Sequence, residues 1–263
     1  MTFMIMKLGR VENDLHPNPY PIRQPQGSDY RSKRTLRKCA KRGLSHLAGR
    51  CVRSYRRYFQ GWLRIMKILI ACEESQAVCV EMRKAGHEAY SCDTQECSGG
   101  YPDWHIQGDV LEQLHKGWDM MIAHPPCTYL TNAGVCHLHK DPRRWLKLFE
   151  AGSFFKKLMN APIEKIAVEN PIMHKYGKAL IGDINQSQVI QPWMFGHKEQ
   201  KATCLWLKNL PKLTPTDDVK KEMMNLPKNQ RERIHYLPPG PDRAKLRSKT
   251  FLGIAKAMAE QWG

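Results

Sequence analysis

The chain has 263 residues, of which 41% are hydrophobic and 25% charged, a composition typical of a globular protein with one sizeable core. No apolar run approaches the ~18 residues that a membrane span needs, and the short apolar start "MTFMIM" has no small-residue cleavage site. We therefore expect a cytoplasmic protein without a membrane segment, although its net charge of +17 calls for a further explanation.

The excess positive charge is mostly a property of residues 1–65. This segment holds 15 Lys/Arg against 3 Asp/Glu, whereas the other 198 residues hold 27 against 22. Its first part is rich in proline and polar residues and predicts disorder. In residues 35–65 apolar side chains recur every three or four positions, which indicates a basic amphipathic helix able to contact phosphates. An equally strong interpretation is that the compact domain begins at Met66, directly before an apolar strand.

From Met66 onward, predicted strands and helices alternate. The strands are 67–71, 87–93, 118–123, 164–170, 187–193 and 203–207; the helices are 75–86, with Ser75 as N-cap and Gly86 as stop, then 143–161 and 253–262. This alternation predicts an α/β, Rossmann-like fold: a mainly parallel sheet in residues 66–263 with helices on both faces. Ligands of such sheets bind beyond the carboxyl ends of the strands.

Polar side chains follow successive strands at this edge. Glu73 and Glu74 follow the first strand, Asp93 ends the second, and Asp109 is placed beyond a third; Cys127 and Glu169 follow the next two. Asp93 is where nucleotide-binding sheets place an acid for ribose hydroxyls, and Asp109 could accept from an adenine amino group. Taken singly, each aspartate is explained as well by an Asx-turn or a helix cap.

A thiol beside a carboxylate can activate a pyrimidine. Addition of a Cys127 thiolate to C6 of cytosine would make C5 nucleophilic, provided that an acid near N3 neutralises the developing charge. Glu169, buried and held protonated, suits that role. Pro125 and Pro126 restrict the backbone before the cysteine. The alternative is a small apolar cysteine packed beneath a helix.

The motifs "HPPC" and "VENP" resemble the catalytic pair of DNA cytosine-5 methyltransferases. The order of "AGHEAYSCD", "GDV", "FG" at 195–196 and the closing helix agrees with that family over residues 66–263. The chain is also similar to small phage- and prophage-associated cytosine methyltransferase-like proteins, through "HIQGDV", "AHPPCTYL", "AVENP", "KATCLWL" and "PPGPDR".

The resemblance implies a Rossmann-like methyltransferase fold, S-adenosylmethionine as cofactor and DNA as partner. Its catalytic residues would be Cys127, Glu169, Asn170 and Pro126, and its cofactor-binding residues Cys72, Glu73, Glu74, Ser75, Asp93 and Asp109. Residues 128–142 would close over a base flipped out of the stack. Candidates for contacts to nucleic acid are Arg143, Arg144, Lys198, Lys201 and Arg243, although a solvated helical turn explains Arg143 and Arg144 equally well.

Three features depart from the family. The first loop, "ACEESQAV", lacks the family's glycines; "GHKEQKATCLW" replaces its arginine-bearing motif; and only residues 208–249, a small basic loop region, stand in place of a recognition domain. Two alternatives therefore remain, an amino-methyltransferase related through "HPPC" and a catalytically degenerate nucleic-acid-binding protein.

The nine cysteines include no C-x-x-C pair, so neither a disulfide framework nor a structural zinc site is expected. Cys136, His137 and His139 could begin a zinc site, but no second ligand pair with suitable spacing follows. We expect no metal.

Overall fold

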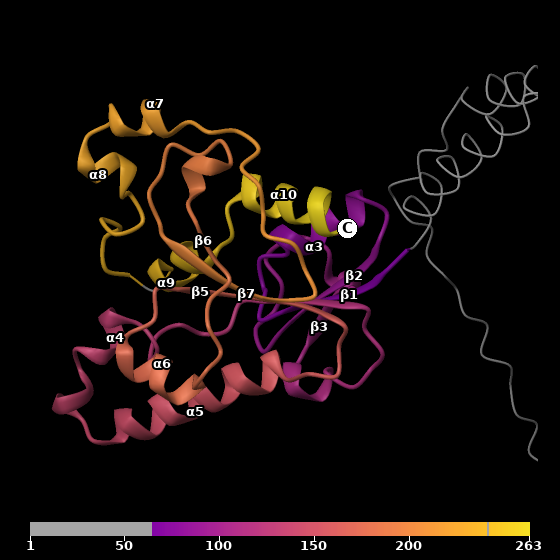
Figure 1. The fold of residues 1–263 in the computed structure, drawn as a ribbon, viewed down its shortest axis with the longest axis horizontal. Helices are drawn as coiled ribbons and strands as arrows, with labels where there is room; N and C mark the ends of the chain where they lie inside the picture. Colours follow the sequence, from indigo (N-terminus) through magenta and orange to yellow (C-terminus); the bar gives the residue numbers. More distant parts are fainter. Residues whose placement is uncertain (1–64, 241) are drawn as a thin grey trace, which may run out of the picture. The chain divides into compact units, whose positions relative to one another are not determined.

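Within residues 65–240 and 242–263, which the computed structural model describes, seven strands form a sheet in the order β3-β2-β1-β4-β5-β7-β6 (Figure 1). The strands are β1 (Lys67–Ala71), β2 (Glu88–Asp93), β3 (His105–Gln107), β4 (Met120–Ala123), β5 (Lys165–Pro171), β6 (Gln188–Ile190) and β7 (Thr203–Lys208). The expectations for residues 1–64, including most of the predicted basic helix, lie outside this range.

The sheet is parallel from β3 to β5. β1 pairs with both β2 and β4, so the chain order reverses between β1 and β4, and β4 pairs with β5. Such a reversal opens a crevice at the carboxyl ends of the two strands, where Rossmann-like proteins bind ligands. The predicted α/β, Rossmann-like fold is thus confirmed.

β7 departs from the parallel pattern, because it runs antiparallel to both β5 and β6. Pro171, at the end of β5, pairs with Thr203, at the start of β7. The residues that precede β7 therefore arrive at the same edge as the residues that end β5.

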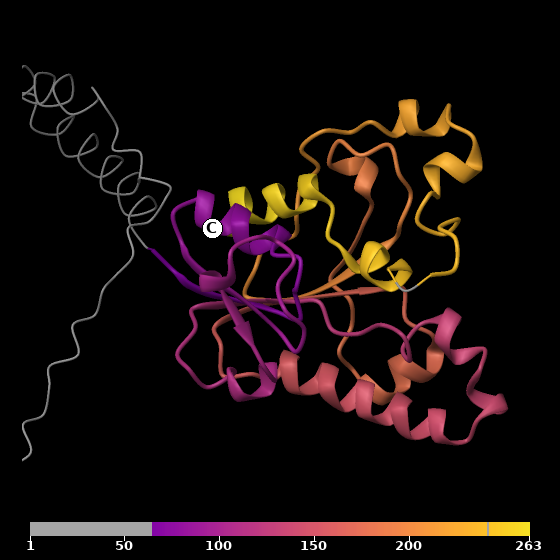
Figure 2. The same cartoon turned by 180° about the vertical axis from the view of Figure 1, so that it is seen from behind.

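Helices cover both faces of the sheet (Figures 1 and 2). α3 (Ala77–Lys84) packs with α10 (Leu252–Trp262) on one face, and α5 (Arg143–Met159) packs with α6 (Lys175–Ile181) on the other. Alternate residues of each strand face the two layers, as the pleat requires. In β1, Ile68 and Ile70 contribute to the core beneath α3 and α10, whereas Leu69 and Ala71 contribute to the core beneath α5.

Short helices fill the connections. They are α4 (Asn132–Val135), α7 (Lys220–Met224), α8 (Lys228–Arg231) and α9 (Arg243–Ser248), with 3-10 turns at Pro102–Trp104, Val110–Glu112, Leu138–Lys140 and Pro192–Met194. Residues 208–249, expected to be a loop region, thus contain three of these helices. Among the residues described, no helix is long and apolar enough to cross a bilayer.

The helix after β1 begins later than predicted. Ser75 is not its N-cap; the cap position is Gln76, which adopts a left-handed backbone conformation (φ 55°) and makes no capping bond. The predicted stop at Gly86 is confirmed, since this residue has a φ of 98° and its N–H bonds to the carbonyl of Arg83.

The buried side chain of Gln76 ties the loop after β1 to the loop after β2. Its Nε2 donates to the carbonyl of Tyr101 (2.8 Å) and its Oε1 accepts from the Tyr101 N–H (3.0 Å). Gly99 lies against this bridge. A Cβ at this position would lie 2.5 Å from the Cβ of Gln76 and 2.7 Å from the carbonyl oxygen of Ser75.

We expect Gly99→Ala to lower the free energy of unfolding by about 1–3 kcal/mol, because backbone and a buried side chain must move to admit one methyl group. Urea denaturation would measure this. Gly240→Ala is the matched control, since nothing lies within 4 Å of a Cβ there. Equal stability of the two variants would refute the close approach.

Candidate active site

The segment that carries Cys127 continues from β4 at the carboxyl edge of the sheet. The N–H of His124 bonds to the carbonyl of Ala71 (2.9 Å), so the β1–β4 ladder runs one residue past the strand. The amide of Asn170, which is fully buried, donates to the carbonyl of Pro125 (3.4 Å). Pro125 is buried and Pro126 exposed, and Cys127 is half-buried. Cys127 is therefore not sealed in the core, and Asn170 is placed to support its loop.

Glu169 lies next to this segment. Ala123 pairs with Val168 in the parallel β4–β5 ladder, so the next residue of each strand, His124 and Glu169, also lie side by side. His124 Nδ1 lies 3.2 Å from Oε2 of Glu169, and the two side chains are 7% and 16% exposed. His124 was not among the site residues predicted from the sequence; its position directly after β4, opposite Glu169 in β5, was the available signal.

The prediction that Glu169 is held protonated is wrong for the free protein. Burial by itself raises the pKa of Glu169, but the hydrogen bond from His124, the charge of Lys201 and the hydroxyl of Thr203 outweigh burial and lower the pKa below its ordinary value. Glu169 is thus a carboxylate near neutral pH.

The pKa of the Cys127 thiol is shifted in the opposite direction, upward. Burial raises its pKa, and the negative charge of Glu169 raises it further, whereas Lys201 and Arg247 act against this rise. Two conclusions follow. Cys127 and Glu169 lie close enough to interact electrostatically, and the thiol is protonated in the free protein.

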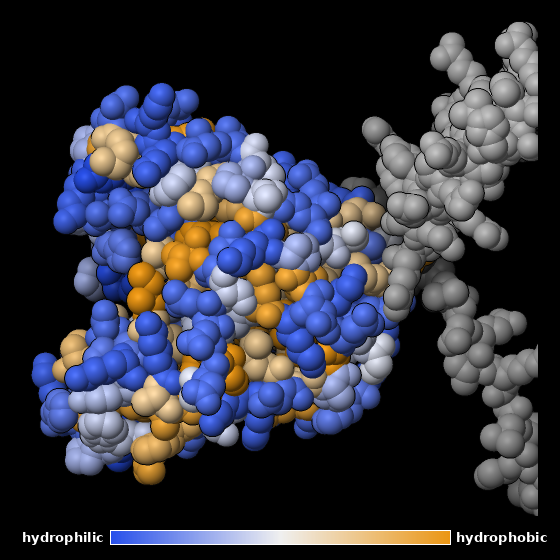
Figure 3. Space-filling view, viewed as in Figure 1, coloured by the Kyte–Doolittle hydropathy of each residue, from blue (hydrophilic) through white to orange (hydrophobic). Residues whose placement is uncertain are grey.

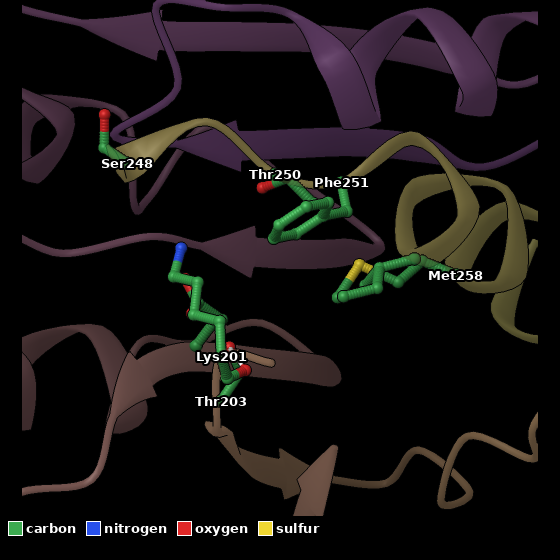
Figure 4. Close-up of a pocket in the computed structure, with 8 residues that line it drawn as sticks. Lys201, Thr203, Ser248, Thr250, Phe251 and Met258 are labelled. Atoms are coloured by element: carbon green, nitrogen blue, oxygen red, sulfur yellow. Dashed lines mark hydrogen bonds between the residues drawn. The ribbon is translucent and has the colours of Figure 1, made fainter. Parts of the chain in front are cut away.

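Lys201 reaches Glu169 because β7 is antiparallel. A pocket is lined by eight residues: Glu169, Lys201, Thr203, Ser248, Thr250, Phe251, Ile254 and Met258. Figure 4 shows Lys201 and Thr203 on one side of it and Thr250, Phe251 and Met258 on the other. The ammonium of Lys201 donates to the carbonyl of Arg247 (2.8 Å) and lies 5.9 Å from the centre of the Phe251 ring. A carboxylate, a cation and an aromatic ring therefore line one pocket.

The surface is hollowed beside this edge. In Figure 3 the molecule is indented between the part with α7 and α8 and the part with α4, and apolar surface flanks the indentation. Chain segments far apart in sequence thus form the two sides of the hollow.

The two acids of the first loop bond within the protein. The carboxylate of Glu73 accepts from the N–H groups of Val78 (2.7 Å) and Cys79 (3.2 Å), which makes it the N-terminal cap of α3. The carboxylate of Glu74 accepts from the hydroxyl of Ser98 and pairs with Lys245 (3.5 Å). Both acids are buried. Neither is free to bind a cofactor's ammonium group unless these contacts break.

Cys72, Asp93 and Asp109 gather at the same edge as this loop. Burial raises the pKa of the Cys72 thiol, and the charges of Asp93 and Asp109 raise it further. Each aspartate makes the local turn considered above: Asp93 accepts from the Gln95 N–H (3.0 Å), and Asp109 caps a 3-10 turn through the Leu111 N–H (2.9 Å). Half-buried Ser75 completes the set of predicted cofactor residues.

All five basic candidates make contacts within the protein, and those of Lys201 are described above. Arg143 is exposed and pairs with Asp141 (3.0 Å), and Lys198 pairs with Glu222 (2.5 Å). Arg144 and Arg243 point inward. Arg144 donates to the carbonyl of Gly134 (3.2 Å) and lies over the ring of Tyr129, so it braces the 128–142 loop. Arg243 donates to the carbonyls of Leu237 and His235. For Arg144 and Arg243 the structure favours a bracing role over phosphate contact.

The part of the chain that the structure describes contains no group of three His, Cys, Asp or Glu side chains arranged to hold a metal ion. Cys136 instead donates to the carbonyl of Ala133, and His139 packs against Trp145.

Comparison with known proteins gives little guidance. No protein-family model matches the chain, and no curated protein matches it. One solved structure that matches is the E. coli "putative DNA modification methyltransferase encoded within prophage". It is 14% identical with a TM-score of 0.39, and the aligned part covers 62% of this chain and 56% of that chain. Functional assignment therefore depends on the site itself.

We expect Glu73→Ala to lower the free energy of unfolding by about 1–2 kcal/mol, because two N–H groups at the start of α3 lose their acceptor. The control is Glu96→Ala, which removes an exposed acid from the same edge. Urea denaturation of both variants would test the assignment, and a stable Glu73→Ala protein would show that water caps the helix equally well.

Proposed function

We propose that this chain is a DNA cytosine-5 methyltransferase that forms a covalent adduct between Cys127 and a flipped cytosine. The observation that carries the proposal is that Cys127 follows β4 and Glu169 lies near the end of the adjacent parallel strand β5, at one edge of the sheet, where the buried amide of Asn170 ties the two segments together. The charge of Glu169 accordingly raises the pKa of the Cys127 thiol. The thiol is half-buried, and Glu169 lines a small pocket at the same edge, which would have to widen toward Cys127 to admit a ring.

Each group has a chemical role in this reaction. The Cys127 thiol loses its proton and adds to C6, and a proton from Glu169 neutralises N3 as C5 becomes electron-rich. Because Glu169 is ionised in the free protein, it must gain a proton by the time the adduct forms. The second oxygen of the carboxylate would accept from the exocyclic amine, which distinguishes cytosine from uracil.

The side chains that line the pocket would complement a flat base with a carbonyl. The ring of Phe251 offers a stacking surface, and the ammonium of Lys201 would donate to O2 of the base. In this arrangement Lys201 contacts the base rather than a phosphate of the DNA backbone. The exposed Arg143 remains the candidate for phosphate contact.

S-adenosylmethionine would supply the methyl group. The loop after β1 fits this cofactor better than a dinucleotide, since Glu73 occupies the N-terminus of α3, where a pyrophosphate would otherwise bind. S-adenosylmethionine carries no phosphate. Asp93 and Asp109 each use one oxygen locally, so their second oxygens would meet its ribose and adenine.

The amino-methyltransferase alternative is less well supported. It needs the residue at the His124 position to grip an amine, but His124 is buried and bonded to Glu169. One observation favours the catalytically degenerate alternative, because both acids of the first loop bond within the protein. Calorimetric titration with S-adenosylmethionine separates it from the enzyme, since a degenerate fold would release no heat.

We expect Cys127→Ser to reduce 5-methylcytosine formation on the order of 10²-fold or more, since the hydroxyl is a far weaker nucleophile. The assay uses labelled S-adenosylmethionine and DNA digested to nucleosides. Cys136→Ser, which changes an exposed cysteine, is the control and should keep full activity. Label in an N-methylated base, or no adduct with 5-fluorocytosine DNA, would contradict the mechanism.

We expect Lys201→Met to lower kcat/KM for cytosine methylation about 10- to 100-fold, the effect of losing a charged hydrogen bond to the base. Lys198→Met is the matched control, because its partner Glu222 lies at the surface, and it should change kcat/KM by less than about twofold. Equal losses in the two variants would place Lys201 on the DNA backbone instead.

A further inference from the structure

His124 is a buried titratable residue that the reaction described above does not use. Its ring is 7% exposed, its Nδ1 bonds to Glu169, and its Nε2 is buried without a partner among the described residues. The contact with Glu169 is therefore the polar interaction that fixes the ring.

We propose that His124 is a positioning residue that stores the proton which Glu169 passes to N3 of the target cytosine. This inference rests on the proposed function and adds a residue to it. It also answers the question that an ionised Glu169 raises, namely where the proton for the ring comes from.

The charged groups around His124 favour its cationic form. Glu169 faces it from β5 and Glu73 from the loop after β1; Lys201, which precedes β7, opposes them, and Cys127 follows on its own loop. Burial lowers the pKa of His124, but the hydrogen bond and charge of Glu169, together with Glu73, outweigh burial and raise the pKa above its ordinary value. The pair thus holds one proton, on Nδ1, directed at Oε2 of Glu169.

The proton balance of the step is as follows. Cys127 first loses its proton to solvent. As its thiolate forms the S–C6 bond, the Nδ1 proton moves to Oε2 of Glu169, and this same proton then passes from Oε2 to N3, because the ionised carboxylate holds no other proton. The second carboxyl oxygen accepts from the exocyclic amine. The imidazolium becomes neutral imidazole, the thiolate charge is consumed by the new bond, and the adduct is a neutral enamine. The proton returns along the same path when the thiolate leaves.

The test compares pH–rate profiles of wild type and His124→Gln with DNA and S-adenosylmethionine. A glutamine amide can still donate to Glu169 but cannot release a proton, so Glu169 must then hold the proton alone. We expect the deficit of His124→Gln to grow with pH, from a few-fold at pH 5.5 to on the order of 10²-fold at pH 7.5. The ratio of the two profiles cancels the ionisation of Cys127, which both proteins share.

His115→Gln, which changes an exposed histidine outside residues 128–142, is the matched control and should reproduce the wild-type profile. A deficit in His124→Gln that is the same at every pH would show that His124 serves structure alone and would overturn the proposal. If wild type makes no 5-methylcytosine, the proposed function itself fails. This outcome differs from a pH-independent deficit in His124→Gln, which refutes only the role of His124.

A second measurement is independent of activity. NMR titration of the histidine rings should show a resonance, absent from His124→Gln, that titrates above the ordinary histidine pKa. In Glu169→Gln the same resonance should titrate at lower pH, because the partner charge is gone. If the His124 resonance titrates at the same pH in Glu169→Gln as in wild type, the proposal that His124 stores a proton for Glu169 is refuted.

Discussion

The parallel register of β4 on β5 is the constraint on which the site depends. Because Ala123 lies opposite Val168, the residues that follow, His124 and Glu169, are placed together by backbone pairing alone. The antiparallel strand β7 adds Lys201 from the other side, since its first residue pairs with the last residue of β5. Three ionisable side chains from distant parts of the sequence therefore meet at one edge without any loop having to be long or adaptable.

Their meeting explains how a carboxylate remains ionised in a buried place. Removing Glu169 from water costs free energy that a single weak partner would not offset. His124, Lys201 and Thr203 together lower its pKa despite burial, while the nearby thiol of Cys127 stays neutral. The free protein thus holds the carboxyl group ionised and the thiol protonated. Under the proposed function, binding of a base would have to reverse both states.

Local patterns predicted much of the fold. Apolar runs located β1 at its observed bounds, and helical periodicity found α5 and α10 within two residues of their ends. The direction of β7 could not be read in this way, because an apolar strand has the same pattern whether it is parallel or antiparallel. For the same reason the pattern did not distinguish Lys201 from Lys198 as a candidate for contact to nucleic acid. The ionisation of Glu169 was also beyond the sequence, since it depends on partners that are 32 to 45 residues away along the chain.

The first loop shows how a glycine-poor sequence can build a turn that usually needs glycine. Cys72 and Gln76 both adopt left-handed conformations (φ 58° and 55°), which cost on the order of 1 kcal/mol each for residues with a Cβ. Gln76 offsets this through its bonds to Tyr101, and the glycine needed for close approach, Gly99, lies in the opposing loop. Glu73 then caps α3 from within the chain. Close backbone approach and an acceptor at the helix start are thus both retained, but the acceptor belongs to the protein.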